Sequence, residues 1–143
     1  MGTTYHNDVV AWANEQAALL RSGQFSAIDI ENIAEEILDV GKSEQRELTR
    51  RMAVLLAHLL KWQFQPERRC NSWANTLKHQ RKSLELHLKK VPSLRPKLAE
   101  TDWLEAIWTD ALVIAEQENC LDIFPESCPW TIENTLSSEW LPE

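Results

Sequence analysis

The stretch LTRRMAVLLAHLLKWQFQP, residues 48–66, decides the fold of this chain. At about 100° per residue its leucines fall on one face of a helix, and Pro66 ends that helix. The same face continues toward the N-terminus beyond Gly41, so we expect one long helix from about Ser26 to about Gln65, either continuous or kinked at Gly41. The apolar side chains of this face project within about 60° of one line along the helix; they are Ile30, Ile33, Ile37, Leu48, Met52, Leu55, Leu59 and Trp62.

Helices are expected in the rest of the chain too. Only 3 of 143 residues are glycine, and no stretch alternates β-branched residues, which favours an all-helical protein. Cap, glycine and proline signals predict helices at about 4–22, from 71 or 72 to 91, and from 94 or 102 to 119. Ser26-Ala27-Ile28-Asp29 reads as a capping box for the long helix, and a short helix is expected after Pro129.

These elements predict an all-α fold, a small helical bundle of about four main helices with a long second helix and a Pro-punctuated C-terminal tail. The length, with 43% apolar residues, suits a single domain over residues 1–143. A continuous second helix of about 57 Å would exceed the diameter of a small domain. That length favours either a kink or a protruding end that forms a homodimer.

Features of the N-terminus and the cysteines place the protein in the cytoplasm. No apolar run approaches the roughly 20 residues of a membrane span. The N-terminus lacks the pattern of a signal peptide, and Met1-Gly2-Thr3-Thr4-Tyr5-His6 lacks the hydroxyl residue that a myristoylation signal needs. Cys70, Cys120 and Cys128 are odd in number and lack CxxC spacing, so we expect reduced thiols.

Charge is unevenly distributed along the chain, whose net charge is −7. Residues 61–97 carry ten basic and two acidic groups, whereas residues 98–143 carry eleven acidic groups and no basic one. The basic segment, with its interspersed tryptophans, has the composition of a nucleic-acid footprint. An acidic helix that packs antiparallel to the basic one would neutralise it, so nucleic-acid binding is the less favoured interpretation.

Polar residues seven apart follow the edge of the apolar face of the second helix. Glu44, Arg51 and His58 share one row, with Glu47 beside them, and Arg81 takes an apolar position on the third helix. A charged side chain does not enter a buried face without a partner. We therefore predict a semi-buried polar cluster of Glu44, Glu47, Arg51, His58 and Arg81, in which each arginine meets a carboxylate.

Three further residues are expected at the rim of this cluster. Lys61 projects away from the row of His58 toward the basic surface, Ser72 is explained as a helix cap, and Gln80 neighbours Arg81. The cluster fits a structural role that fixes helix register better than a catalytic one. No Glu-x-x-His spacing occurs around His58, so we predict neither a metal nor another cofactor.

The chain resembles a mostly bacterial family of unknown function, domain-of-unknown-function family twenty-nine, over nearly its whole length. The resemblance implies an all-α fold and carries no known activity, cofactor or partner. The family's motif positions that match here are Glu35, Glu36, His58, Lys61, Trp62, Ser72, Trp73, Gln80 and Arg81. The matching segments are DVVAWANEQAALLRSGQF (8–25), DIENIAEEI (29–37), LLAHLLKWQFQP (55–66), SWANTLKHQR (72–81), PSL (92–94) and FPESCPW (124–130).

Three functional hypotheses follow. The first is a cytoplasmic protein–protein interaction or regulatory protein without catalysis of its own, a homo-oligomer through the long second helix. The second is a nucleic-acid-associated regulator that uses residues 61–97. The third is a ligand-binding or catalytic site at the polar cluster of Glu44, Arg51, His58 and Arg81.

Overall fold

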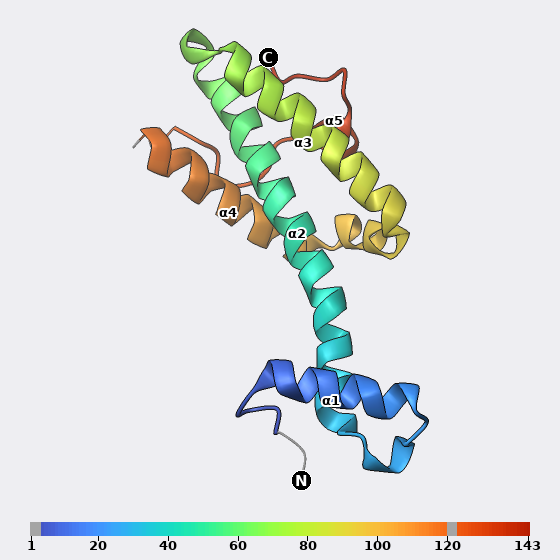
Figure 1. The fold of residues 1–143 in the computed structure, drawn as a ribbon. Helices are drawn as coiled ribbons and strands as arrows, with labels where there is room; N and C mark the ends of the chain where they lie inside the picture. Colours follow the sequence, from blue (N-terminus) through green and yellow to red (C-terminus); the bar gives the residue numbers. More distant parts are fainter. Residues whose placement is uncertain (1–3, 120–122) are drawn as a thin grey trace. The chain divides into compact units, whose positions relative to one another are not determined.

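The computed structural model of this chain describes residues 4–119 and 123–143. Met1-Gly2-Thr3 and Cys120, which entered our sequence predictions, lie outside these residues. Every regular element within them is helical, which confirms the predicted all-α fold (Figure 1). The α-helices and the 3-10 helices (η) are α1 (Val9–Arg21), η1 (Phe25–Ala27), α2 (Ile30–Phe64), η2 (Pro66–Arg68), α3 (Asn71–Lys90), η3 (Pro92–Ala99), α4 (Thr101–Asn119) and α5 (Ile132–Leu136). None of the helices in this described part is long and apolar enough to span a membrane.

The chain divides into two compact units at Glu44 and Gln45. The N-terminal unit contains α1, η1 and the first part of α2, and the C-terminal unit contains Gln45–Glu143. Gly41 lies within the helical residues of α2 and does not end the helix. Since neither unit is known to fold by itself, the prediction of one domain stays a prediction.

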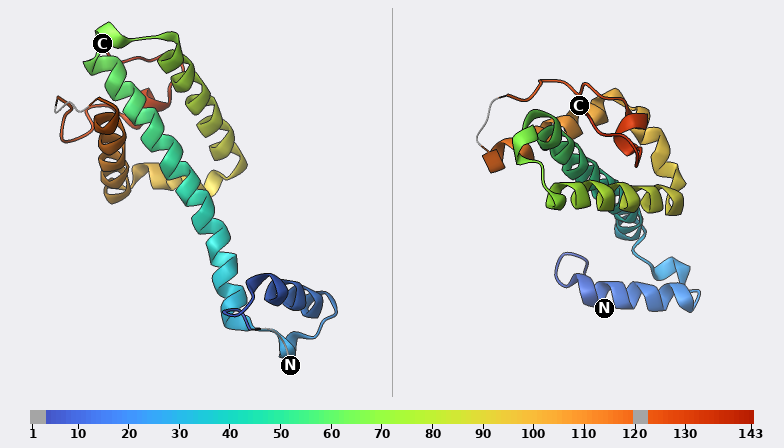
Figure 2. Two further views of the ribbon diagram at one scale, coloured as in Figure 1. Left: turned by 60° about the vertical axis from the view of Figure 1, so that its left-hand side comes forward. Right: turned by 90° about the horizontal axis from the view of Figure 1, so that it is seen from above.

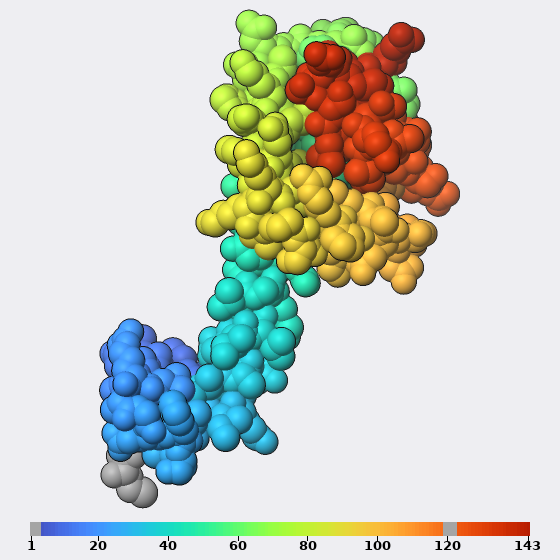
Figure 3. All heavy atoms as spheres, turned by 90° about the vertical axis from the view of Figure 1, so that its right-hand side faces the viewer, coloured from blue at the N-terminus to red at the C-terminus, as the bar shows by residue number. Residues whose placement is uncertain are grey.

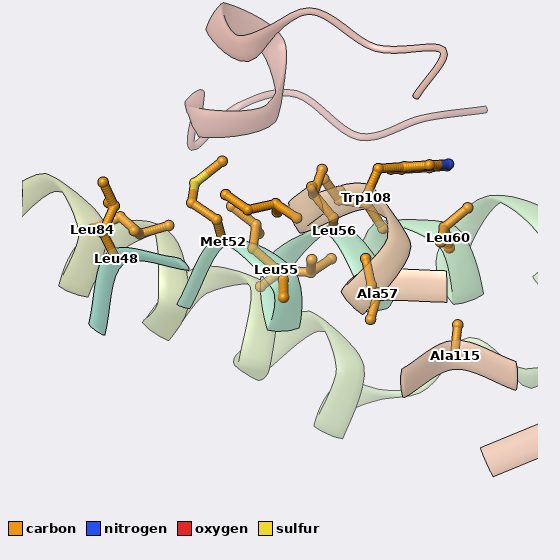
Figure 4. Close-up of a cluster of buried hydrophobic side chains, with 14 of the residues drawn as sticks. Leu48, Met52, Leu55, Leu56, Ala57, Leu60, Leu84, Trp108 and Ala115 are labelled. Carbon is orange, nitrogen blue, oxygen red and sulfur yellow. The ribbon is translucent and has the colours of Figure 1, made fainter. Parts of the chain in front are cut away.

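In the C-terminal unit, the second part of α2 runs between α3 and α4 (Figures 1 and 2). Leu48, Met52, Leu55 and Leu59 of the predicted stripe are fully buried there. The other faces of this segment also carry buried residues, namely Ala53, Leu56, Ala57 and Leu60. They belong to the same core cluster as Leu84 of α3 and Trp108 and Ala115 of α4 (Figure 4). Burial in this part of α2 therefore extends beyond a single face, although Arg46 and Arg50 stay exposed.

Proline sets the boundaries after α3. Pro92 and Pro96 place residues 92–99 in η3, so α4 begins at Thr101, the later of the two predicted starts. The short helix predicted after Pro129 is α5, where the Thr131 side chain accepts a hydrogen bond from the Asn134 amide at 3.1 Å. Trp130 and Trp140 meet edge-to-face, with ring centroids 6.0 Å apart, and pack on the core. They hold the tail on the unit.

Two helices of the N-terminal unit begin later than predicted. Asp8 caps α1 by accepting a hydrogen bond from the Ala11 amide at 3.1 Å, so α1 starts at Val9 and not at Thr4. Residues 25–27 form η1, and Asp29 instead of Ser26 accepts from the first turn of α2, through the Asn32 amide at 3.4 Å. Gly23 has a φ of 75°, which fits the left-handed cap predicted for it.

The fully buried Leu59 is the position at which we test the core. Leu59→Ala is expected to lower the free energy of unfolding by about 2–5 kcal/mol, because it removes buried methyl groups and leaves a cavity. Leu86→Ala on the exposed side of α3 is the control and should change it by less than about 0.5 kcal/mol. Chemical denaturation of both variants measures the difference, and equal losses would contradict the described core.

Candidate functional site

Glu47, Arg51 and His87 form a polar cluster between α2 and α3. Glu47 Oε1 accepts hydrogen bonds from Arg51 Nη2 at 3.0 Å and Nε at 3.2 Å, and His87 Nε2 lies 3.7 Å from Glu47 Oε2. The Arg51 hydrogen bonds are the main cause that holds the pKa of Glu47 below its usual range, and His87 contributes. The cluster thus joins two helices through one carboxylate.

The structure changes the membership of the predicted cluster. Glu47 and Arg51 come together, whereas His58 and Arg81 have other partners, and Glu44 is the half-buried last residue of the N-terminal unit. Sequence reasoning missed His87, which is buried although it projects to the edge of the α3 stripe. The sequence signal that could have identified His87 is its position seven residues after Gln80, on the same edge of the third helix.

His58 is half-buried on α2 and bonds to its own helix. Its Nδ1 lies 2.9 Å from the Val54 carbonyl oxygen. A carbonyl only accepts, so Nδ1 carries the proton, and Nε2 of the neutral ring is left as an acceptor. Burial is the main cause that lowers the pKa of His58; the Lys61 charge lowers it further, and the Val54 bond and Glu118 oppose these effects.

Lys61 lies in the interior and not at the rim where we predicted it. Only 2% of its surface is exposed, its Nζ pairs with Glu118 of α4, and it stands 5.1 Å from the ring centroid of Trp73 on α3. The prediction was wrong because it assumed one buried face of α2, whereas α3 and α4 cover the helix on both sides. The apolar stem packs in the core while the ammonium reaches a half-exposed carboxylate.

Arg81 is the most isolated charge of the predicted set. It is buried on α3, and its Nε donates to the backbone oxygen of Thr135 on α5 at 2.9 Å. Its Nη2 is buried and has no hydrogen-bond partner among the described residues. Burial lowers the pKa of this guanidinium. Instead of the carboxylate that we expected, Arg81 meets one neutral acceptor.

The two other rim residues differ from each other. Ser72 is exposed in the first turn of α3, and Cys70 occupies the cap position without a side-chain hydrogen bond. Ser72 is therefore not the cap that we predicted. Gln80 is half-buried, and its buried Oε1 has no partner in the described part of the chain.

In the N-terminal unit, polar contacts gather on Asp29 between α1 and the start of α2. Its carboxylate accepts hydrogen bonds from Trp12 Nε1 at 2.9 Å and Asn32 Nδ2 at 2.8 Å, and its amide donates to Gln16 Oε1 at 2.7 Å. These bonds hold the pKa of Asp29 below its usual range, with the Asn32 side chain as the main cause. Asp29 and its partners fix the two helices of this unit against each other.

Comparison with known proteins agrees with the motifs found in the sequence. The profile of a family described as "Domain of unknown function DUF29" matches residues 4–141. The chain belongs to this family. No curated protein and no solved structure matches it. Since membership of the DUF29 family brings no activity with it, function has to be argued from the geometry of this chain.

Acidification is expected to destabilise the fold through His58. The folded chain binds the His58 proton less readily than the unfolded chain, whose histidine has a pKa near 6.5. The stability that comes from neutral His58 is fully present above this pH and is lost as the pH falls below it and through the lower pKa of the folded chain. His58→Gln should therefore show a smaller fall in Tm between about pH 7.5 and 5.

The exposed His79 provides the matched control for this measurement. His79→Gln should keep the pH dependence of the wild-type chain. If His58→Gln and the wild-type chain lose the same Tm on acidification, His58 is not buried in its neutral form.

The Lys61–Glu118 pair is tested by removing one charge or both. Glu118→Gln should cost about 1–3 kcal/mol of stability, because it leaves a buried ammonium without its carboxylate. Adding Lys61→Met should restore most of this loss, since the apolar stem of Met fills the same space. Urea denaturation of the two variants measures the difference, and a double variant no more stable than Glu118→Gln would contradict the buried pair.

Proposed function

We propose that this chain is a protein–protein interaction module that self-associates through the exposed part of α2. The observation that supports the proposal is the exposure of the first part of the α2 apolar stripe. Ile30 and Ile37 of the stripe are 67% and 66% exposed, and Leu38 and Val40 on either side of it are 57% and 68% exposed, whereas the stripe residues Leu48, Met52, Leu55 and Leu59 are fully buried. Soluble chains rarely leave so many large apolar side chains together on one short helical segment unless a partner covers them.

The N-terminal unit is too thinly packed to explain this exposure by its own fold. Among its described residues only Trp12 and Gln16 are buried. Val9, Val10 and Phe25 add further exposed apolar surface on α1 and η1. A unit of roughly 40 residues ordinarily needs a disulfide, a metal or oligomerisation to be stable.

The centre of the exposed face suits close approach of a second helix. Ala34 and Gly41 are one heptad apart and project between Ile37 and Leu38. A Cβ added at Gly41 would meet nothing within 4 Å, so the surface there is open. Small residues at such a position let two helix backbones pack closely.

The order of charges along α2 favours a second copy of this chain as the partner. Three carboxylates at 31, 35 and 39 are followed by three cations at 42, 46 and 50, and all six lie on one strip of the helix. Two antiparallel copies centred between Val40 and Gly41 set Glu35 near Arg46 of the other copy, at the edge of the apolar face next to Leu38. Such a surface is complementary to itself about a two-fold axis.

The basic segment 61–97 supports the nucleic-acid alternative less well. Lys61 and Arg81 are buried, Lys82 and Lys97 lie within ion-pair distance of Glu85 and Glu100, and Arg69 donates to the Trp62 carbonyl. Phosphate binding needs cations that are free to face the backbone. We therefore place self-association first.

The dimer is tested at its apolar centre and at its charges. Ile37→Glu should weaken self-association at least tenfold, because it buries a charge in an apolar interface. Glu35→Arg and Arg46→Glu should each weaken it by placing like charges opposite each other, and the double variant should restore it. Sedimentation equilibrium gives the dimer Kd of each variant.

Leu86→Glu is the matched control, because Leu86 is an exposed apolar residue of α3 in the C-terminal unit. It should leave the dimer Kd unchanged. A wild-type chain that is monomeric at 100 μM, or a double variant weaker than both single variants, would refute the antiparallel dimer.

A further inference from the structure

The buried guanidinium of Arg81 has no counter-ion in the part of the chain that the structure describes. The hydrogen bond from its Nε to Thr135 is the only one that it makes to a described residue, and it forms no ion pair with any of them. A guanidinium has five N–H donors and always carries its charge in proteins. Burying such a charge costs several kcal/mol unless an anion and further acceptors compensate. Lys61, by contrast, has Glu118 for this purpose.

Arg81 lines a cavity of about 250 Å³ in the C-terminal unit. The other lining residues are Glu85 and Leu88 of α3, Arg95 of η3 and Leu136 of α5. Figure 3 shows the three contributing segments side by side: the tail with α5 in red, α3 in yellow-green and η3 in gold. The cavity therefore lies where the tail meets the bundle.

The charges of the lining leave an excess of positive groups for a ligand. Arg95 is exposed and makes no hydrogen bond or ion pair to a described residue. Glu85, the one carboxylate in the lining, lies 3.8 Å from Lys82 outside the cavity. The lining thus contains two guanidiniums, of Arg81 and Arg95, that have no acidic partner among the described residues. Its one carboxylate, of Glu85, also lies near Lys82.

We propose that this cavity binds a small organic anion, a carboxylate or a phosphate with a short apolar body, between Arg81 and Arg95. Guanidinium groups hold both kinds of oxyanion through paired N–H donors. Leu88 and Leu136 supply the apolar wall for the body of the ligand. The volume lies below the roughly 300–1,000 Å³ of pockets for drug-sized molecules, which selects a small ligand.

Binding would also strengthen the attachment of the C-terminal tail. Arg81 already holds the Thr135 carbonyl, and Leu136 of the same short helix lines the cavity. An anion that neutralises Arg81 removes the cost of its burial against α5 and so stabilises the docked tail. Ligand binding would in this way favour the conformation in which the C-terminal tail is docked on the bundle.

The experiment is an NMR titration of the full chain with sodium propionate and, separately, with sodium phosphate, at constant ionic strength set with sodium chloride. Saturable shifts of amide signals in α3, η3 and α5 are expected with at least one of the two anions. Saturation with propionate alone identifies a carboxylate site, and saturation with phosphate alone identifies a phosphate site. Shifts that do not saturate with either anion, or that spare these three elements, would overturn the proposal.

Variants of exposed lining residues test the assignment without disturbing the core. Arg95→Gln should weaken binding about tenfold or more by removing one of the two cations. Glu85→Gln should tighten it several-fold by removing a like charge. Lys89→Gln, an exposed charge of α3 outside the cavity lining, is the matched control and should leave the affinity unchanged. Equal affinities in Arg95→Gln and Lys89→Gln would also refute the site.

Discussion

Burial of the second part of α2 on more than one face is the constraint on which the C-terminal unit depends. An amphipathic surface helix buries one stripe, but this segment is covered by α3 on one side and by α4 on the other. Alanines at 53 and 57 allow this close covering, and leucines fill the remaining faces. A polar residue on a buried face of such a segment has to find a partner, as Lys61 finds Glu118 on α4.

The two buried cations of the unit meet this constraint in different ways. Lys61 reaches across to Glu118, whose side chain is half exposed, so the charge of the pair borders on water. Arg81 reaches the carbonyl of Thr135, which satisfies one donor and leaves the charge uncompensated. The first arrangement is complete within the chain, whereas the second has no acidic partner among the described residues, which is why we propose an anion there. Of the two cations, Arg81 is therefore the one at which we propose a ligand.

Patterns within one helix made much of the fold predictable from the sequence. The apolar period of the long helix and the signals at Gly23, Pro66 and Pro129 each depend on a few neighbouring residues. Local rules therefore predicted that the elements are helices and where most of them end. The exceptions were positions where two candidates for a cap competed, as with Ser26 and Asp29. Asp29 is the better choice because Trp12 and Gln16 of α1 also bond to it, and such contacts between helices are not visible in a local pattern.

The candidate sites were less predictable for the same physical reason. Projection correctly indicated that Arg81 lies on a buried face, but it contains no information on which group lies opposite, so Thr135 in a helix 54 positions away was not foreseen. It also assigned Ile30 and Leu59 to the same stripe, although the first is exposed and the second is buried. The stripe is covered by its own chain over only part of its length, and we propose that a partner covers the rest. The charge order of α2, with acids before Val40 and bases after Gly41, favours a second copy of the same helix as the proposed partner.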